Sequence, residues 1–154
     1  MKHVVVVEDD AHNAVLFRRI LEKRAGCRVT QTEDPAQVLE LVKGGDVALV
    51  VMDVSLRHSK WQGRPAGGVE ICQLIRAQSL RHVPILLCTA HAMRGDAERL
   101  LKQSGADDYV SKPITDHERF AALAMQMMER AAGRPRPTSA SWSSRTTRSS
   151  SACC

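Results

Sequence analysis

The sequence predicts an α/β protein with a doubly wound, five-stranded parallel sheet and five helices, stacked in three layers as α/β/α. Two uninterrupted apolar runs, Val4–Val7 and Val47–Met52, are typical of strands that helices cover on both faces. Between the predicted strands, apolar residues recur at helical spacing, so strands and helices alternate along the chain. This alternation favours parallel strands joined by helical crossovers on the two faces of one sheet.

The first strand, Val4–Val7, leads through an acidic turn into a helix predicted from about residue 11 to residue 25. Gly26 ends this helix as a cap. The next segment, residues 27–32, is short and alternates with polar residues, which indicates an edge strand. The apolar residues expected to face inward from the helix are Val15, Leu16, Ile20 and Leu21.

Asp34 and Pro35 begin a second helix, with the aspartate as its cap and the proline in its first turn. Its inward residues are Val38, Leu39 and either Leu41 or Val42, and a Gly-Gly pair ends it before the Val47–Met52 strand. Residues 54–67 show no periodicity, and we expect a long loop there.

The second half of the chain continues the alternation of helices and strands. The elements expected there are a helix over 68–79 with Val69, Cys72 and Ile75 inward, a strand over 83–88, a helix over 92–103, a strand over 108–110, and a last helix capped by Thr115 or Asp116 that runs to about residue 132.

The composition permits a sizeable aliphatic core, because 44% of the residues are hydrophobic and only 3% are aromatic. No stretch approaches the roughly 18 apolar residues of a membrane span, and the first ten residues do not resemble a signal peptide. We therefore expect a cytoplasmic protein with no membrane partner. The cysteines show no metal-binding or disulfide pattern, and Cys27, Cys72 and Cys88 lie in apolar surroundings typical of core residues.

The net charge of +5 depends on the last residues of the chain, since four arginines and no acids follow Gly133. The preceding part carries 18 basic and 17 acidic residues, so direct nucleic-acid binding is not indicated. Residues 133–154 are rich in Ser, Thr, Arg and Pro and poor in apolar residues. We predict a folded domain over residues 1–132 and a disordered tail over 133–154, either a linker or an aberrant reading frame.

Polar side chains follow the predicted strands at the edge where ligands gather in open α/β sheets. These residues are Glu8, Asp9 and Asp10 after the first strand, Asp53 after the third, Thr89 after the fourth and Lys112 after the fifth. Clustered carboxylates favour a bound cation, and an all-oxygen set with room for water and phosphate favours Mg²⁺. A divalent cation beside an ammonium group suits phosphoryl transfer, and Asp53 could itself be the nucleophile.

Four motifs, taken in their order and spacing, resemble the receiver domain of two-component response regulators, the CheY-like family. They are V-V-E-D-D at 6–10, V-M-D at 51–53, C-T-A at 88–90 and Y-V-S-K-P at 109–113. The resemblance extends over residues 2–132 and is greatest to single-domain receivers of the DivK type. It implies the flavodoxin-like strand order 2-1-3-4-5.

The resemblance also implies that Asp53 accepts a phosphoryl group from a histidine kinase or a histidine phosphotransferase. Glu8, Asp9, Asp53 and the backbone carbonyl of Ser55 would hold Mg²⁺, with Glu8 acting largely through water. Beyond its own phosphorylation and dephosphorylation, such a protein is no enzyme. It signals by binding an output protein, which the sequence does not identify.

Three further residues take roles from the resemblance. Lys112 would pair with the phosphate, and the Lys112–Pro113 bond would be cis. Thr89 would bind the phosphate through its hydroxyl, while Tyr109 moves inward. Together they would switch a protein-binding face formed by the fourth helix, the fifth strand and the fifth helix.

One segment departs from the family pattern. Thr89 lies 36 residues beyond Asp53, several more than is usual for a receiver. The additional residues, about Arg57 to Pro65, are basic and include Trp61. We expect this segment to border the phosphorylation site.

Other functions remain open at this stage. A Mg²⁺-dependent phosphohydrolase of the haloacid-dehalogenase type would also use an aspartate nucleophile, but Ser55 stands where its second acid belongs. A flavodoxin-like redox protein would need a Ser/Thr-rich loop in place of the acidic turn. The chain could also be the N-terminal receiver of a truncated multidomain regulator, or a receiver fold that serves only as a scaffold.

Overall fold

The computed structural model describes residues 1–56, 59–78, 83–90 and 94–132. Within them, five parallel strands form one sheet in the order β2-β1-β3-β6-β7, which confirms the predicted order 2-1-3-4-5. The elements are β1 (His3–Val7), α1 (Ala11–Arg24), β2 (Arg28–Thr32), α2 (Pro35–Lys43), β3 (Val47–Asp53), β4 (Lys60–Trp61), β5 (Arg64–Pro65), α3 (Gly68–Gln78), β6 (Ile85–Thr89), α4 (Arg94–Ser104), β7 (Asp108–Ser111) and α5 (His117–Ala132).

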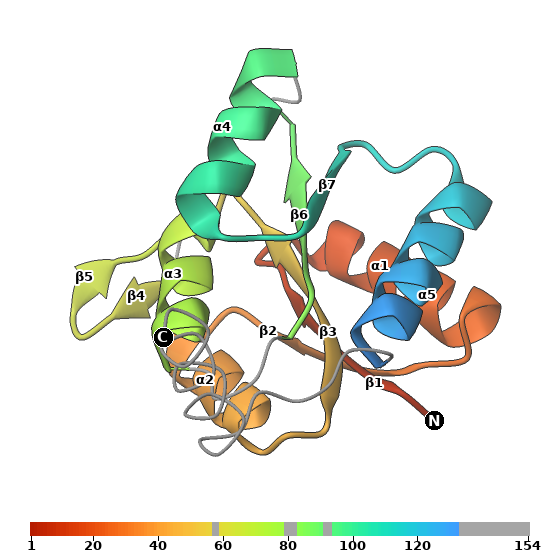
Figure 1. Ribbon diagram of the computed structural model, residues 1–154, viewed down its shortest axis with the longest axis horizontal. Helices are drawn as coiled ribbons and strands as arrows, with labels where there is room; N and C mark the ends of the chain where they lie inside the picture. The colour runs from red at the N-terminus through yellow and green to blue at the C-terminus, as the bar shows by residue number, and fades with distance from the viewer. Residues whose placement is uncertain (57–58, 79–82, 91–93, 133–154) are drawn as a thin grey trace, which may run out of the picture.

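The sheet separates two hydrophobic cores, as expected when both faces of a parallel sheet are covered. Helices α1 and α5 cover one face, and α2, α3 and α4 lie on the other (Figure 1). Alternate residues of β1 serve the two cores: Val4 and Val6 belong to the α1–α5 side, and Val5 and Val7 to the α2–α3 side. The prediction that the uninterrupted apolar runs are strands buried on both faces is therefore confirmed.

The buried face of helix α1 differs in part from the face that the apolar periodicity predicted. Val15 was expected to face the core, but it is 56% exposed. The buried stripe runs instead through Ala14, Phe17 and Leu21, and Val15 lies about 100° around the helix from Ala14. Phe17, which the expected set omitted, stacks against Phe120 of α5 with ring centroids 5.4 Å apart.

The ends of the helices follow local chemistry. The Asp10 carboxylate accepts hydrogen bonds from the backbone N–H groups of His12 and Asn13 and so caps α1. Gly26, with φ +63°, lies just beyond α1 in the left-handed conformation that glycine tolerates best. The remaining alternatives are settled as well, since Val42 rather than Leu41 is buried and Asp116 caps α5.

The prediction of a loop over residues 54–67 was wrong in part. Strands β4 and β5 form an antiparallel hairpin with a two-residue turn, Gln62 and Gly63. Both turn residues have positive φ, as a type I′ turn requires. The hairpin projects on the α2–α3 side of the sheet (Figure 1). The Ser59 hydroxyl donates to the backbone carbonyl of Glu33, 2.6 Å away, and Trp61 packs against the core on that side.

Three further sequence predictions concern the cysteines, the C-terminal segment and the membrane. Cys27, Cys72 and Cys88 are buried, as expected. Residues 133–154, for which we predicted a disordered tail, lie outside the described part of the chain. Within the described part, no helix combines the length and apolar character needed to cross a membrane.

Candidate functional site

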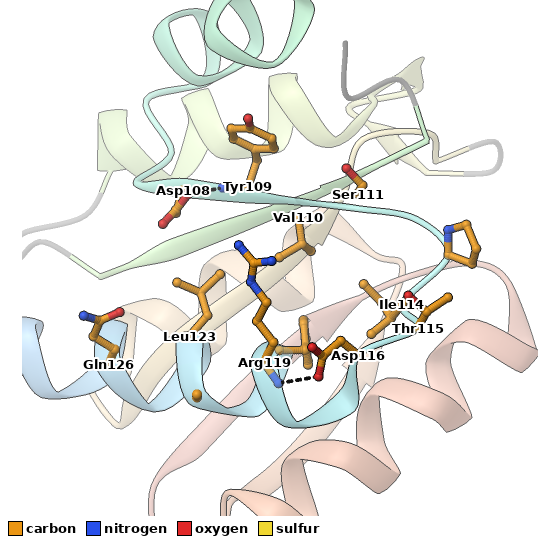
Figure 2. Close-up of a pocket in the computed structure, with 13 residues that line it drawn as sticks. Asp108, Tyr109, Val110, Ser111, Ile114, Thr115, Asp116, Arg119, Leu123 and Gln126 are labelled. Carbon is orange, nitrogen blue, oxygen red and sulfur yellow. Dashed lines mark hydrogen bonds between the residues drawn. The ribbon is translucent and has the colours of Figure 1, made fainter. Parts of the chain in front are cut away.

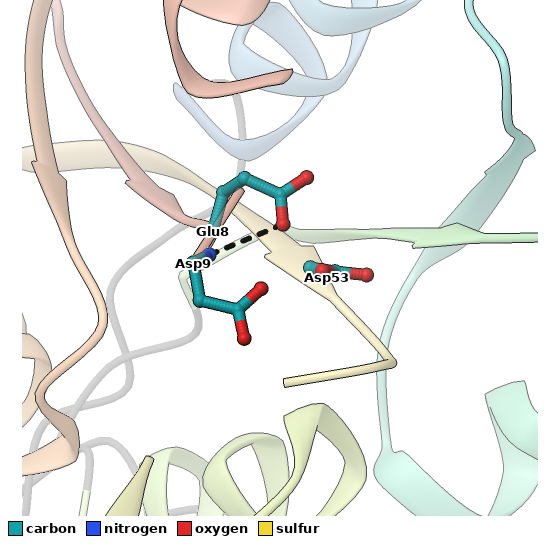
Figure 3. A group of neighbouring side chains, drawn as sticks. All are labelled: Glu8, Asp9 and Asp53. Atoms are coloured by element: carbon teal, nitrogen blue, oxygen red, sulfur yellow. Dashed lines mark hydrogen bonds between the residues drawn. The ribbon is translucent and has the colours of Figure 1, made fainter. Parts of the chain in front are cut away.

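Three acidic side chains meet at the carboxyl edge of the sheet. Strand β1 ends at Val7, directly before Glu8 and Asp9, and its neighbour β3 ends at Asp53. One carboxylate oxygen from each acid lies within 4.8 Å of the others, and Figure 3 shows them converging. Glu8 and Asp53 are buried, with 0% and 4% exposure, whereas Asp9 is half-buried.

Lys112 completes this cluster from the turn after β7. Its Nζ lies 2.8 Å from Glu8 Oε1 and 3.0 Å from Asp53 Oδ1, so one ammonium group bridges two buried carboxylates. Its own side chain is only 15% exposed. The backbone N–H of Lys112 donates to the carbonyl of Thr89, and the Lys112–Pro113 peptide bond is cis, as the resemblance implied.

Burial and mutual contact shift the protonation of these groups. Burial and the side-chain hydrogen bond with Asp53 raise the pKa of Glu8 to about 7, although the nearby Lys112 acts to lower it. Burial would raise the pKa of Asp53 too, but bonds to Glu8, Lys112 and the Ser55 N–H outweigh it and hold the pKa below its ordinary value. Burial likewise acts against the charge of Lys112, yet the two carboxylates raise its pKa. Asp53 is therefore an ionised carboxylate paired with a firmly charged lysine.

The acidic cluster suits a small hard cation. All three acids offer oxygen, the ligand type that Mg²⁺ prefers. Oxygens on opposite sides of a Mg²⁺ ion lie about 4.2 Å apart. The three oxygens of the cluster lie within 4.8 Å of one another, a comparable range. Even with Glu8 partly protonated near pH 7, a single lysine leaves negative charge in the cluster that a cation would balance. The predicted set of Glu8, Asp9 and Asp53 is thus brought together in a form that fits the ion.

The backbone around Asp53 is held tightly. The Ser55 N–H donates to Asp53 Oδ1 at 3.1 Å, and the Val54 N–H donates to the carbonyl of Cys88 at 3.0 Å. Gly68, the first residue of α3, packs directly on this strand end: a Cβ there would lie 2.2 Å from the Asp53 carbonyl oxygen. The absence of a side chain at Gly68 lets α3 begin against the acceptor strand.

The two remaining predicted residues lie on the neighbouring strands. Thr89 is the last residue of β6 and is 1% exposed; the preceding residue, Cys88, pairs in register with Asp53. Tyr109 is half-buried in β7, and its ring packs against the α2–α3 side core. In Figure 2 its ring points away from Arg119 and Leu123 of α5, which lie on the other side of β7.

A hollow of about 930 Å³ lies along β7 and the start of α5, beginning at the residues that flank Lys112. Ser111, Pro113, Thr115 and Arg119 are among its lining residues (Figure 2). The described residues that line this hollow do not include Glu8, Asp9, Asp53 or Lys112, so it is separate from the acidic cluster.

Two residues at the site were not singled out from the sequence. Gln31, on edge strand β2, donates from Nε2 to the backbone carbonyl of Glu8 at 2.7 Å. Nothing in a polar edge strand indicates which side chain will reach the neighbouring turn. Gly68 left a weak signal, because a helix that begins with glycine lacks a good helix former and suggests a close contact.

A comparison with protein families decides the relationship. The response regulator receiver domain model matches residues 4–124. The chain belongs to the response regulator receiver family. It is thus the receiver domain of a two-component response regulator, and receivers of this family accept phosphoryl groups from histidine kinases and signal to output partners.

Known relatives of this receiver agree in sequence and in fold. It is 34% identical over 115 residues to the polar-differentiation response regulator DivK of Brucella ovis, which covers 74% of this chain and 86% of DivK. The receiver domain of the TMAO respiratory system response regulator TorR is 25% identical with a TM-score of 0.69, and the match covers 85% of this chain and 99% of that one.

Two further structures extend the comparison. The receiver domain of the sensor histidine kinase PA1611 from Pseudomonas aeruginosa PAO1 has a magnesium ion in its active site cleft; it is 28% identical, with a TM-score of 0.64 and coverage of 86% and 98%. NtrX from Brucella abortus matches at a TM-score of 0.69 and 21% identity over 84% of this chain. This receiver spans only 27% of the NtrX chain.

Proposed function

We propose that Asp53 is the phosphoacceptor of this receiver and that a histidine kinase or a histidine phosphotransferase is the donor. The single observation that carries this proposal is the position of Lys112, whose ammonium group lies 3.0 Å from Asp53 and 2.8 Å from Glu8. An ionised carboxylate beside a fixed cation, at the edge of the sheet, is a nucleophile for which charge compensation is already in place.

In the transfer, an Asp53 carboxylate oxygen forms a bond to phosphorus as the bond from phosphorus to the donor's imidazole nitrogen breaks. The electron pair of that bond leaves with the imidazole. Lys112 neutralises charge on the phosphoryl oxygens, and the Ser55 N–H keeps the Asp53 carboxylate oriented. Mg²⁺, when bound by Glu8, Asp9, Asp53 and the Ser55 carbonyl, supplies further neutralisation of the phosphoryl charge.

The output is proposed to be a change of binding surface. The phosphoryl group carries a charge of roughly −2 and would attract the hydroxyl of Thr89, which ends the neighbouring strand β6. Movement of Thr89 would free space for Tyr109, which is half-buried in β7. The face formed by α4, β7 and α5 would then bind an output protein. We propose residues 1–132 as the unit that does this, with 133–154 as a disordered tail.

The test uses a small phosphodonor, which needs no partner protein. Incubation with acetyl phosphate and Mg²⁺ should add one base-labile phosphoryl group to the wild type, detected as intact mass. Asp53→Asn should not be labelled, whereas Asp46→Asn, which alters an exposed acid at the opposite end of β3, should be labelled normally. Labelling of Asp53→Asn to the wild-type level would refute the assignment.

The same experiment separates a receiver from a phosphohydrolase. We expect one phosphoryl group per chain and no sustained turnover of phosphoesters. Continuous release of phosphate from an added phosphoester, lost in Asp53→Asn, would instead identify an enzyme that uses Asp53 as its nucleophile.

A further inference from the structure

The peptide between Glu8 and Asp9 joins two members of the acidic cluster, and both of its polar groups are held by hydrogen bonds. Its N–H donates to Glu8 Oε2 at 3.2 Å (Figure 3). Its carbonyl, that of Glu8, accepts from Gln31 Nε2 at 2.7 Å. Because a peptide unit is planar, these two bonds fix the orientation of the peptide and with it the position of the Asp9 Cα.

The hydrogen-bond pattern of the β1–β2 ladder explains why a side chain, and not the backbone, donates to the Glu8 carbonyl. The Glu8 N–H still pairs with the Thr32 carbonyl, at 3.3 Å, as a continuation of the β1–β2 ladder. In a parallel ladder the Glu8 carbonyl would next accept from the N–H of residue 34. That N–H donates instead to the Thr32 hydroxyl, because the chain turns into α2 there. The Gln31 amide takes its place.

Glu8 is fully buried, so its carbonyl requires a donor. We propose that Gln31 is a positioning residue for the divalent-cation site: its side-chain amide fixes the Glu8–Asp9 peptide and thereby holds the Asp9 carboxylate within the cluster. The inference rests on the proposed function, since it requires that Glu8, Asp9 and Asp53 bind Mg²⁺. Gln31 acts through the backbone and is not itself a ligand.

The experiment measures the Kd for Mg²⁺ by calorimetry on the full chain. Gln31→Met keeps the length of the side chain but has no donor, and it should raise the Kd about fivefold, the effect of losing one hydrogen bond. Gln31→Ala opens space for a water molecule that can donate to the carbonyl, so its Kd should rise less. In both variants, phosphorylation of Asp53 should recover the wild-type rate at saturating Mg²⁺, because Lys112 and Asp53 are untouched.

Gln73→Met is the matched control. Gln73 of α3 makes the same kind of bond, from Nε2 to the carbonyl of Gln103 at 2.8 Å, on an exposed helix surface. Its Kd should equal that of the wild type, which separates a local effect from a general loss of stability.

Several results would overturn the inference. The inference would be overturned if the Kd of Gln31→Met for Mg²⁺ lay within twofold of the wild-type value. It would also be overturned if the Kd of Gln73→Met rose as much as that of Gln31→Met. A larger rise in Gln31→Ala than in Gln31→Met would point to packing and not to the donor. If the wild type bound no Mg²⁺, the cation site itself would be refuted. If the wild type and Gln31→Met bound Mg²⁺ equally well, only the proposed role of Gln31 would be refuted.

Discussion

Substitution of Gly68 by alanine should damage both the stability of the protein and its acceptor site. The added Cβ would lie 2.2 Å from the Asp53 carbonyl oxygen and 2.9 Å from the Val54 Cα, both backbone atoms. Ordinary contact of a Cβ begins at 3.4 Å, so α3 and the end of β3 must separate by roughly 1 Å. Overpacking of this kind costs about 3 kcal/mol, at the upper end of the usual range.

Urea unfolding gives the stability of Gly68→Ala, and labelling by acetyl phosphate gives the rate at Asp53. A shift of about 1 Å at a reacting group can lower a rate about 100-fold. Gly95→Ala is the matched control, since Gly95 also lies in the first turn of a helix and a Cβ there meets nothing within 4 Å. It should be neutral or more stable by up to about 1 kcal/mol. A Gly68→Ala variant within about 0.5 kcal/mol of the wild type would refute the packing argument.

Three further predictions concern residues away from the acidic cluster. Arg76→Ala should lower the free energy of unfolding by about 2 kcal/mol in a urea titration, because Arg76 donates to the carbonyls of Gly105 and Val83 and to the Asp107 carboxylate; an unchanged midpoint would contradict this. Burial and nearby Arg28 lower the pKa of His3 below 6.5, so the unfolded chain binds the proton more readily and stability is lost as the pH falls through that value. The wild type should therefore lose more stability than His3→Gln between about pH 7.5 and 5.5, and equal losses would count against the shift. Burial raises the pKa of Cys72 to about 12, so this thiol should react with iodoacetamide only after denaturation, as mass spectrometry of its peptide would show; labelling in the native protein would be the contrary result.

Much of the architecture follows from local patterns. The apolar runs of β1 and β3 predicted strands that are buried on both faces, and both cores use them in that way. Asp34 predicted the start of α2, because a capping carboxylate acts on residues only two or three positions away, and in the structure Asp10 caps α1 in the same way. Such signals are local in the chain, and the sequence displays them directly.

The errors arose where a local pattern was ambiguous. Val15 satisfies helical spacing, but the orientation of α1 is decided by Phe17, whose ring contacts Phe120 on a distant helix. The β4–β5 hairpin was missed because its strands have two residues each, too few for a period of two to be visible. Its turn also places Gln62, and not only a glycine, at positive φ.

The acidic cluster combines both kinds of information. The sequence by itself determined that acids, a hydroxyl and a lysine follow the strands of a parallel sheet, and in such a sheet the strand ends share one edge. Only the tertiary structure decided the contacts: one ammonium group placed between Glu8 and Asp53, the Gln31 amide on the Glu8 carbonyl, and Gly68 against the Asp53 backbone. Periodicity and capping act over a few residues, whereas these contacts join segments that only the folded chain brings together.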